Sequence, residues 1–179
     1  MDTQRKVLVM FFEYPHKEFH IRQLARATKL HPNTIMTITN KLAREGFIEK
    51  VKSHEKHLVI MKAKTDLLFY KLRKQSYNVE KIYKSGLVDF LNAELAHPTI
   101  VLFGSYAKAE NHERSDIDIF VIADEKKELN VNKFEKVLNA EVQLFLHTKK
   151  EFSKLKKTNP ELVNNVINGY RLAGYLEVL

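Results

Sequence analysis

The chain has 179 residues, which is enough for one large domain or two small ones. Apolar residues make up 44% and charged residues 29% of it, proportions that indicate a folded globular protein and argue against disorder. The absence of cysteine excludes disulfides and thiolate metal sites, and it fits a reducing cytoplasm. The apolar run near the N-terminus is too short to span a bilayer and no small-residue cleavage site follows it. We therefore expect a soluble, cytoplasmic protein with no membrane partner.

The net charge of +8 is unevenly distributed along the chain. Residues 1–97 contain 18 Lys and Arg against 10 Asp and Glu, whereas residues 98–179 contain 12 of each kind. All of the excess positive charge therefore lies in the first half. This asymmetry predicts two domains, of which the N-terminal one faces a polyanion. A solvated basic surface is the alternative interpretation.

Three short helices are predicted in the first part of the chain. Residues 4–14 are apolar at helical spacing and stop before a proline, and a second helical pattern follows within residues 17–30. A third helix begins near Pro32, because proline suits a first helical turn, and Gly46 stands where a C-terminal cap is expected. Its core-facing residues recur at spacings of three and four: Ile35, Ile38 and Leu42.

After residue 46 the apolar pattern changes to roughly every second residue, on both sides of the polar stretch "KSHEK". This pattern predicts a β-hairpin with a basic tip. Three short helices followed by a basic hairpin describe a winged helix-turn-helix, which we assign to residues 1–64. This half is similar to the winged-helix domains of prokaryotic transcription regulators. A winged helix used only for protein docking or dimerisation is the alternative.

In a winged helix the second helix of the pair enters the major groove, and the hairpin reaches phosphates or the minor groove. Asparagine can pair with adenine, and threonine can contact a thymine methyl or a phosphate. The predicted DNA-binding residues lie on the outer face of the third helix and on the hairpin: His31, Asn33, Thr34, Thr37, Lys41, Lys50, Lys52 and Lys56.

Residues 65–97 are predicted to form a helical linker, with Gly86 as a break. Apolar residues at helical spacing give it a stripe: Leu68, Leu72, Val79, Tyr83, Leu87 and Phe90. Packing in a core is the favoured use of this stripe, and pairing with a second copy of the chain is the other. We expect a homodimer formed through these helices.

Residues 98–179 alternate between strand and helix patterns. Strands are predicted over "TIVLFGSY", "DIDIFVIA" and "AEVQLFLHT", and helices over "KELNVNKFEKVLN" and "NPELVNNVINGY", with a final short strand in "RLAGYLEVL". The expected fold class is therefore α+β: a winged helix-turn-helix, a helical linker and a small mixed sheet with flanking helices.

The stretch "FGSYAKAENHERSDIDIFVIAD", residues 103–124, carries the clearest chemical signal. Asp116 and Asp118 are two residues apart on a predicted strand, so both carboxylates point to the same face. Two adjacent carboxylates repel each other, and a bound magnesium ion relieves that repulsion. Gly104 permits close approach of the backbone to a phosphate, and Ser105 offers a hydroxyl at the start of the next helix, whose amides favour anions.

The segment "GSYAKAENHERSDIDIFV" resembles the Gly-Ser…Asp-x-Asp signature of the DNA polymerase beta-like nucleotidyltransferases. It is most similar to the minimal nucleotidyltransferases that act as antitoxins in prokaryotes, and the resemblance covers residues 98–179. It implies that Gly104, Ser105 and Ser115 bind the nucleoside triphosphate. It also implies that Asp116 and Asp118 hold two magnesium ions, which orient the acceptor hydroxyl and stabilise the leaving pyrophosphate.

Two departures from the family pattern concern the loop and the third carboxylate. The family often has a second glycine about five residues after the first, where this chain has Ala109, which is harmless if its φ is negative. Active relatives present a third carboxylate on the next strand, where Gln143 stands here. Glu141 lies two residues earlier on the same strand face, and a small register shift would bring it in as a catalytic group.

The leading hypothesis is a magnesium-dependent nucleotidyltransferase that moves an NMP unit, most plausibly AMP, from an NTP to an acceptor. The resemblance suggests a protein hydroxyl, on a toxin partner, as the acceptor. The second hypothesis is a DNA-binding regulator whose nucleotidyltransferase domain is weakened or inactive. Transfer to a small molecule such as an aminoglycoside is the third, and the short chain leaves little protein to build a pocket for it.

Overall fold

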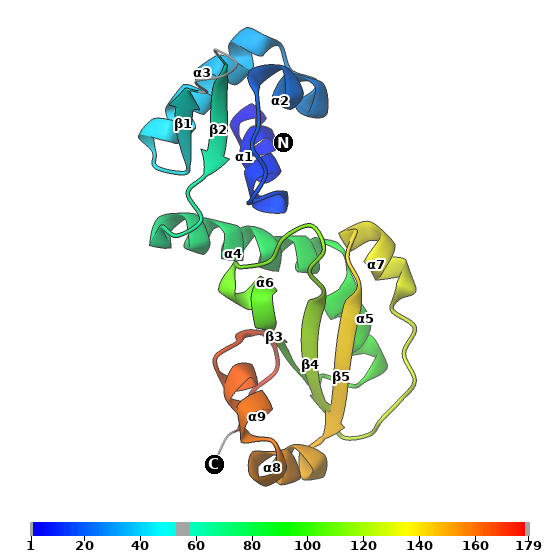
Figure 1. Cartoon of the computed structure of the whole chain (residues 1–179). Coiled ribbons are helices and arrows are strands. Elements are labelled where there is room, and N and C mark those ends of the chain that lie inside the picture. The colour runs from blue at the N-terminus through cyan, green and yellow to red at the C-terminus, as the bar shows by residue number, and fades with distance from the viewer. Residues whose placement is uncertain (1, 53–57, 178–179) are drawn as a thin grey trace. The chain divides into compact units, whose positions relative to one another are not determined.

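The computed structural model describes residues 2–52 and 58–177, and the chain divides into the units Met1–Lys74 and Gln75–Leu179 (Figure 1). The first unit holds α1 (Thr3–Glu13), α2 (Ile21–Thr28), α3 (Pro32–Arg44), β1 (Ile48–Lys52) and β2 (Val59–Ala63). Helix α4 (Leu68–Lys84) begins in the first unit and ends in the second. Among the described residues, no helix is long and apolar enough to cross a membrane.

The first unit folds as the predicted series of three helices and a hairpin. Helix α3 begins at Pro32, and the three residues that the spacing assigned to its inner face are buried: Ile35, Ile38 and Leu42. Strands β1 and β2 pair antiparallel, with Ile48 opposite Ala63. Phe11 and Phe19 meet edge to face in the core, with ring centroids 5.2 Å apart. The winged-helix assignment remains a prediction from this order of elements.

Helix α4 buries a different face from the one that the apolar stripe indicated. Its buried residues recur every four positions: Tyr70, Lys74, Asn78 and Ile82. Two members of the predicted stripe, Leu68 and Leu72, are instead 72% and 53% exposed. The prediction of core packing for that part of the stripe is wrong, because the buried face of α4 carries polar groups that hydropathy spacing does not detect. Gly86, as predicted, separates α4 from α5, with φ of +81°.

The second unit is built on a four-stranded mixed sheet in the order β5-β4-β3-β6. Its elements are α5 (Leu87–Glu94), β3 (Thr99–Phe103), α6 (Gly104–Lys108), β4 (Ile117–Ala123), α7 (Asn132–Leu138), β5 (Val142–Thr148), α8 (Lys149–Thr158), α9 (Pro160–Ile167) and β6 (Tyr170–Ala173). Strand β3 pairs antiparallel with β4 and β6, and β4 pairs parallel with β5. The structure thus contains the small mixed sheet with flanking helices that the sequence predicted.

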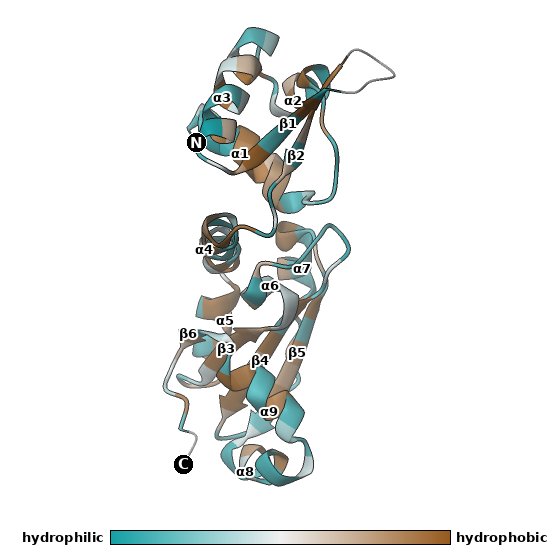
Figure 2. Ribbon diagram, turned by 60° about the vertical axis from the view of Figure 1, so that its left-hand side comes forward, coloured by the Kyte–Doolittle hydropathy of each residue, from teal (hydrophilic) through white to brown (hydrophobic). Residues whose placement is uncertain are grey.

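Both faces of this sheet are covered. Alternate residues of β3 and β4 pack against α5 and α7 on one face, where Leu102 and Ile119 are fully buried. The other residues pack against α8 and α9, where Phe120 contacts Phe152. Because both faces are buried, β3 and β4 are largely hydrophobic, as the colouring of Figure 2 shows, and Asp118 is the charged exception at the beginning of β4.

Several details differ from the predicted elements, including the final strand, which begins at Tyr170 inside the predicted last helix. Helix α7 begins at Asn132, because residues 124–131 form the connection from β4 rather than a first helical turn. Helix α8 was not predicted at all. It starts from a capping box between Thr148 and Glu151, and its single buried residue, Phe152, is too weak a hydropathy signal to reveal it.

Lys74 leads to a prediction on the pH dependence of stability. It is 1% exposed, and burial lowers the pKa of its ammonium group to about 8, against an opposing effect of Glu13. Below pH 8 the folded chain must hold a buried charge, whereas above pH 10.5 neither state is charged at this residue. The free energy of unfolding should therefore rise with pH from about 8 towards 10.5, by up to about 3 kcal/mol.

Urea unfolding between pH 7.5 and 9.5 measures this rise, and Lys74→Met should remove it. The range stops at 9.5 because burial also raises the pKa of Tyr70, which reverses the trend once unfolded tyrosine ionises. An equal rise in wild type and Lys74→Met would contradict the prediction.

Candidate active site

The Gly-Ser and Asp-x-Asp parts of the motif meet at one end of the sheet. Strand β3 ends at Phe103, which lies opposite Asp118 of β4 in the antiparallel register. On the other side of β4, the parallel register places Gln143 of β5 opposite Asp118. Alternation along β4 puts Asp118 on the same face as Phe120, the face that α8 and α9 cover. The end of β3 and the beginnings of β4 and β5 therefore form one site.

Gly104 is packed directly against the carboxylate of Asp118. Its φ is +67°, in the left-handed region that side chains disfavour. A Cβ at this position would lie only 2.1 Å from Asp118 Oδ2. Both the backbone conformation and the available space therefore require glycine here. The carboxylate of Asp118 lies against the backbone at the start of α6.

The carboxylates of Asp116 and Asp118 act on each other electrostatically. Burial, and then the negative charge of Asp116, raise the pKa of the Asp118 carboxyl above its ordinary value. Gln143 reaches this pair, because its Nε2 donates a hydrogen bond to Asp116 Oδ2 at 2.8 Å. The residue at the position of the third carboxylate thus stabilises the charge on Asp116 but adds no charge of its own.

Glu141 lies next to the pair through its backbone. Its carbonyl oxygen accepts a hydrogen bond from Ile117 N at 2.8 Å, which places it beside Asp116, and its side chain is exposed. Within residues 2–52 and 58–177, no three or more His, Asp or Glu side chains are grouped so that they could hold a metal ion. The structure therefore brings Asp116, Asp118 and Gln143 together and does not add the carboxylate of Glu141 to them.

The pair nevertheless fits a hard divalent cation such as Mg²⁺. Magnesium is usually bound by one or two carboxylates, with waters and substrate phosphates completing its shell. Asp116 and Asp118 supply two carboxylates whose repulsion a cation would relieve. The amide oxygen of Gln143 is available as a further neutral ligand if the amide turns away from Asp116.

The other predicted nucleotide-binding residues lie on either side of this pair. Ser105 is half-buried in α6, immediately after Gly104. Ser115 Oγ accepts a hydrogen bond from His112 N at 3.0 Å, which closes the turn that leads into Asp116.

Ala109 ends α6 with φ of +57°, so a harmless negative φ is not what the structure has at this position. Alanine in the left-handed region is strained by roughly 1 kcal/mol. A glycine would adopt the same conformation without that strain. Alanine in place of the family's glycine therefore leaves the backbone strained at the end of α6.

Most of the predicted DNA-binding residues that the structure describes are exposed on the first unit. Those at the beginning and along the outer face of α3 are exposed: His31, Asn33, Thr34, Thr37 and Lys41. His31 also caps the helix, because its Nδ1 accepts a hydrogen bond from Asn33 N at 3.3 Å. On the hairpin, Lys52 is exposed and Lys50 donates to Asn40 Oδ1 at 2.6 Å. Lys56 lies outside the described residues.

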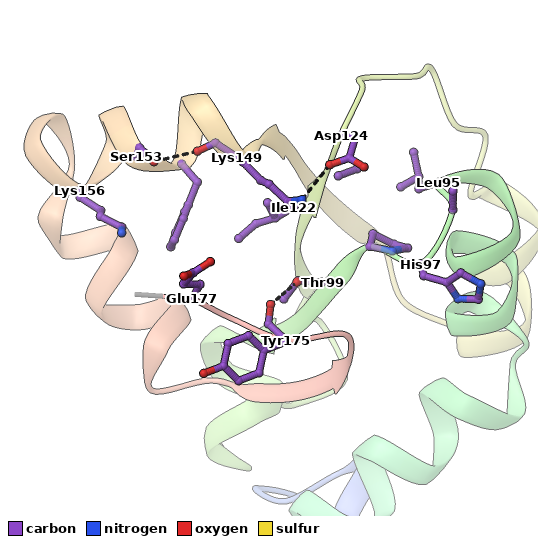
Figure 3. Close-up of a pocket in the computed structure, with 14 residues that line it drawn as sticks. Leu95, His97, Thr99, Ile122, Asp124, Lys149, Ser153, Lys156, Tyr175 and Glu177 are labelled. Carbon is purple, nitrogen blue, oxygen red and sulfur yellow. Dashed lines mark hydrogen bonds and ion pairs between the residues drawn. The ribbon is translucent and has the colours of Figure 1, made fainter. Parts of the chain in front are cut away.

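A separate hollow of about 390 Å³ lies at the other end of the sheet (Figure 3). It is lined by the start of β3, the end of β4 and part of α8, and the ammonium of Lys149 lies 2.9 Å from the carboxylate of Asp124 at its rim. No residue of the Gly-Ser or Asp-x-Asp parts lines it. The hollow is therefore distinct from the carboxylate site.

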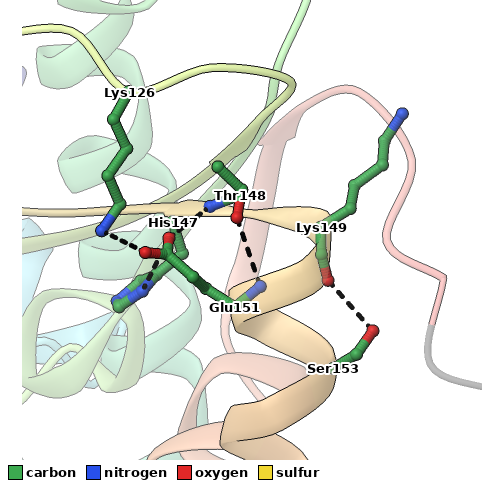
Figure 4. A network of polar contacts seen from close by, with 6 residues as sticks. All are labelled: Lys126, His147, Thr148, Lys149, Glu151 and Ser153. Carbon is green, nitrogen blue, oxygen red and sulfur yellow. Dashed lines mark hydrogen bonds and ion pairs between the residues drawn. The ribbon is translucent and has the colours of Figure 1, made fainter.

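The polar network at the start of α8 is structural (Figure 4). The Glu151 carboxylate accepts a hydrogen bond from Thr148 N at 2.8 Å and lies 2.9 Å from Lys126 Nζ. Lys126, followed by the backbone of Thr148, lowers the pKa of Glu151 to about 2. Glu151 therefore stays ionised and caps the helix.

Sequence reasoning missed two buried asparagines beside the motif. Asn78 of α4 is 1% exposed and Asn111, in the connection between α6 and β4, is 5% exposed. Asn78 Nδ2 donates to Asn111 Oδ1 at 2.8 Å and to the carbonyl oxygen of Tyr106 at 2.9 Å. The available signal was the spacing of Tyr70, Asn78 and Ile82 along one helical face, which an analysis of apolar residues alone does not reveal.

Residues 86–173 match the family model described as Polymerase beta, Nucleotidyltransferase. The match contains the whole of the Gly-Ser…Asp-x-Asp site and supports assignment of this part of the chain to the nucleotidyltransferase superfamily. Domains of this family generally use a nucleoside triphosphate and a divalent metal. Residues 1–85 lie outside the match. No curated protein matches the chain.

Gly104→Ala and Gly86→Ala form a matched pair that tests the contact with Asp118. Both glycines have positive φ, so either alanine should lower the free energy of unfolding by about 1 kcal/mol. At Gly86 the nearest atom to a Cβ is 3.9 Å away, whereas at Gly104 the Asp118 carboxylate must move. We therefore expect only Gly104→Ala to shift the pKa of Asp118, downwards, because the displaced carboxyl gains access to water.

Carboxyl ¹³C NMR titration measures that pKa, and urea unfolding measures the stability of both variants. An unchanged Asp118 pKa in Gly104→Ala would contradict the packing described above.

Proposed function

We propose that the protein is a magnesium-dependent nucleotidyltransferase that moves an NMP unit, AMP in the favoured case, from an NTP to an acceptor hydroxyl. The observation that carries this proposal is the carboxylate of Asp118, which interacts electrostatically with Asp116 and lies against Gly104, where there is no room for a side chain. The family match over residues 86–173 supports the same class of reaction.

Each residue of the site has a role in this reaction. Gly104 lets the Asp118 carboxylate lie against the beginning of α6, and the hydroxyls of Ser105 and Ser115 donate to phosphate oxygens. Asp116 and Asp118 hold the cation, which when bound neutralises charge on the phosphates and on the leaving pyrophosphate. The acceptor oxygen forms a bond to the α-phosphorus as the bond to pyrophosphate breaks. Glu141, whose backbone lies beside Asp116 and whose side chain is exposed, is the group to which we assign the acceptor proton.

The acceptor and the assembly are further parts of the proposal. A hydroxyl on a protein partner, such as a toxin, fits the resemblance to the minimal nucleotidyltransferases, and a reducing cytoplasm fits the cysteine-free chain. The apolar surface at the start of α4 supports a homodimer. Three neighbouring side chains there are more than half exposed: Leu68, Phe69 and Leu72.

Transfer of label from α-³²P-ATP with Mg²⁺ tests the proposed reaction, with the chain alone and with a lysate of the source cells. We expect a labelled acceptor with wild type and none with Asp116→Asn/Asp118→Asn, because the double variant removes both carboxylates. Gln143→Asp should increase labelling by about tenfold, because it supplies the third charge at the position that contacts Asp116. Lack of labelling by wild type with all four NTPs would contradict the proposed activity.

A second function is favoured by the hydrogen bond between Gln143 and Asp116. The Gln143 amide adds no negative charge and donates to Asp116, so the site attracts cations less strongly than three carboxylates would. Weaker cation binding is expected of a domain that binds or senses nucleotide without efficient transfer. The basic first half of the chain then acts as the DNA reader, and the protein is a transcriptional regulator.

The salt dependence of DNA binding tests this second function. Each lysine–phosphate contact contributes about 0.9 to the slope of log affinity against log salt concentration. Lys41→Ala/Lys52→Ala should therefore reduce the slope by about two, whereas the control Lys133→Ala/Lys136→Ala on α7 should leave it unchanged. Equal slopes for the two double variants would contradict the assignment of the DNA-binding face.

A further inference from the structure

Helix α6 carries Gly104 and Ser105 but is too short to be stable alone. It has five residues, and isolated helices of this length do not form in water. Its last carbonyl groups need hydrogen-bond donors from outside the helix. Those partners are side-chain amides of α4: Gln75 Nε2 donates to the carbonyl oxygen of Ala107 at 2.6 Å, and Asn78 Nδ2 donates to that of Tyr106 at 2.9 Å.

The second hydrogen of the Asn78 amide is donated to the connection that leads to the Asp-x-Asp part of the motif. Asn78 Nδ2 also donates to Asn111 Oδ1 at 2.8 Å. Asn111 stands in the connection that runs from α6 to Asp116. A single NH₂ group is therefore bonded both to the helix that begins with Gly104 and to the connection that ends at Asp116.

The environment makes these two bonds important for geometry. Asn78 is 1% exposed, and its acceptors belong to Tyr106 and Asn111, which are 4% and 5% exposed. Water therefore cannot replace the donor if it is lost. A backbone carbonyl can only accept, so the nitrogen of the Asn78 amide must face Tyr106. The Asn78 Oδ1 atom is buried without a hydrogen-bond partner among the described residues, so the side chain serves this site through its donors.

We propose that Asn78 is a positioning residue that holds Gly104 and Asp116 in register with each other. Within the part of the chain that the structure describes, its side-chain hydrogen bonds go to Tyr106 and Asn111, so it acts on the site through α6 and Asn111. Because Gly104 lies against Asp118 with no spare space, a small shift of α6 changes the shape of the site. The nucleotide-binding part of this inference rests on the proposed function.

Hydrogen–deuterium exchange and nucleotide binding together test the role of Asn78. In Asn78→Ala we expect faster amide exchange in two segments, residues 104–109 and 112–117, because both lose the same donor. We also expect the dissociation constant for ATP with Mg²⁺ to rise about tenfold or more, measured well below the unfolding temperature. The exposed neighbour Ser76→Ala is the control and should change neither quantity.

The two readouts separate failure of this inference from failure of the proposed function. Exchange that is unchanged in either segment overturns the positioning role. Faster exchange with unchanged ATP affinity overturns it too, because the contacts would then serve stability alone. If wild type binds no NTP, the proposed function fails. Faster exchange in both segments would still show that Asn78 holds both α6 and the connection to Asp116.

Gln75→Ala keeps the test decisive if Asn78→Ala does not fold. It removes only the bond to Ala107, so faster exchange is expected in residues 104–109 and not in residues 112–117. ATP affinity should fall in the same direction as for Asn78→Ala. Unchanged exchange in residues 104–109 would overturn the role of α4 in holding α6.

Discussion

The contact between the Asp118 carboxylate and the backbone of Gly104 is the constraint on which the site depends. It exists because β3 ends opposite Asp118 and the chain then turns into α6 with a positive φ. Sheet register, the glycine and the short helix are therefore linked, and none can change without moving the carboxylate. The hydrophobic packing on both sheet faces maintains the register. A shift of β4 by one residue would turn Asp118 towards the opposite face, into the hydrophobic core under α5 and α7.

Gln143 determines how the electrostatics of this site differ from those of three carboxylates. A third acid would add repulsion that only cations relieve, whereas the Gln143 amide donates to Asp116. Burial and Asp116 still raise the pKa of Asp118, so part of the repulsion remains for a cation to relieve. The site is thus suited to binding a cation with nucleotide, while the neutral third position predicts slow transfer.

Much of this architecture could be predicted from sequence because strands and motifs leave local signals. The Gly-Ser…Asp-x-Asp spacing predicted the candidate site, and buried strands appear as largely apolar runs. Other features depend on tertiary contacts that leave no such signal. Asn78 gives no hydropathy signal, although it faces inward, and α8 has a single buried residue. Ala109 is left-handed because it ends α6, although alanine disfavours a positive φ.

The most direct measurement is titration of the protein with Mn²⁺ in the presence of a non-hydrolysable ATP analogue, followed by electron paramagnetic resonance. Wild type should bind the ion, and Asp118→Asn should bind it at least about tenfold more weakly, because one of the two carboxylate ligands is lost. Equal affinity in wild type and Asp118→Asn would mean that the carboxylate lying on Gly104 does not hold a metal ion. In that case this end of the sheet would not be a nucleotidyltransferase centre.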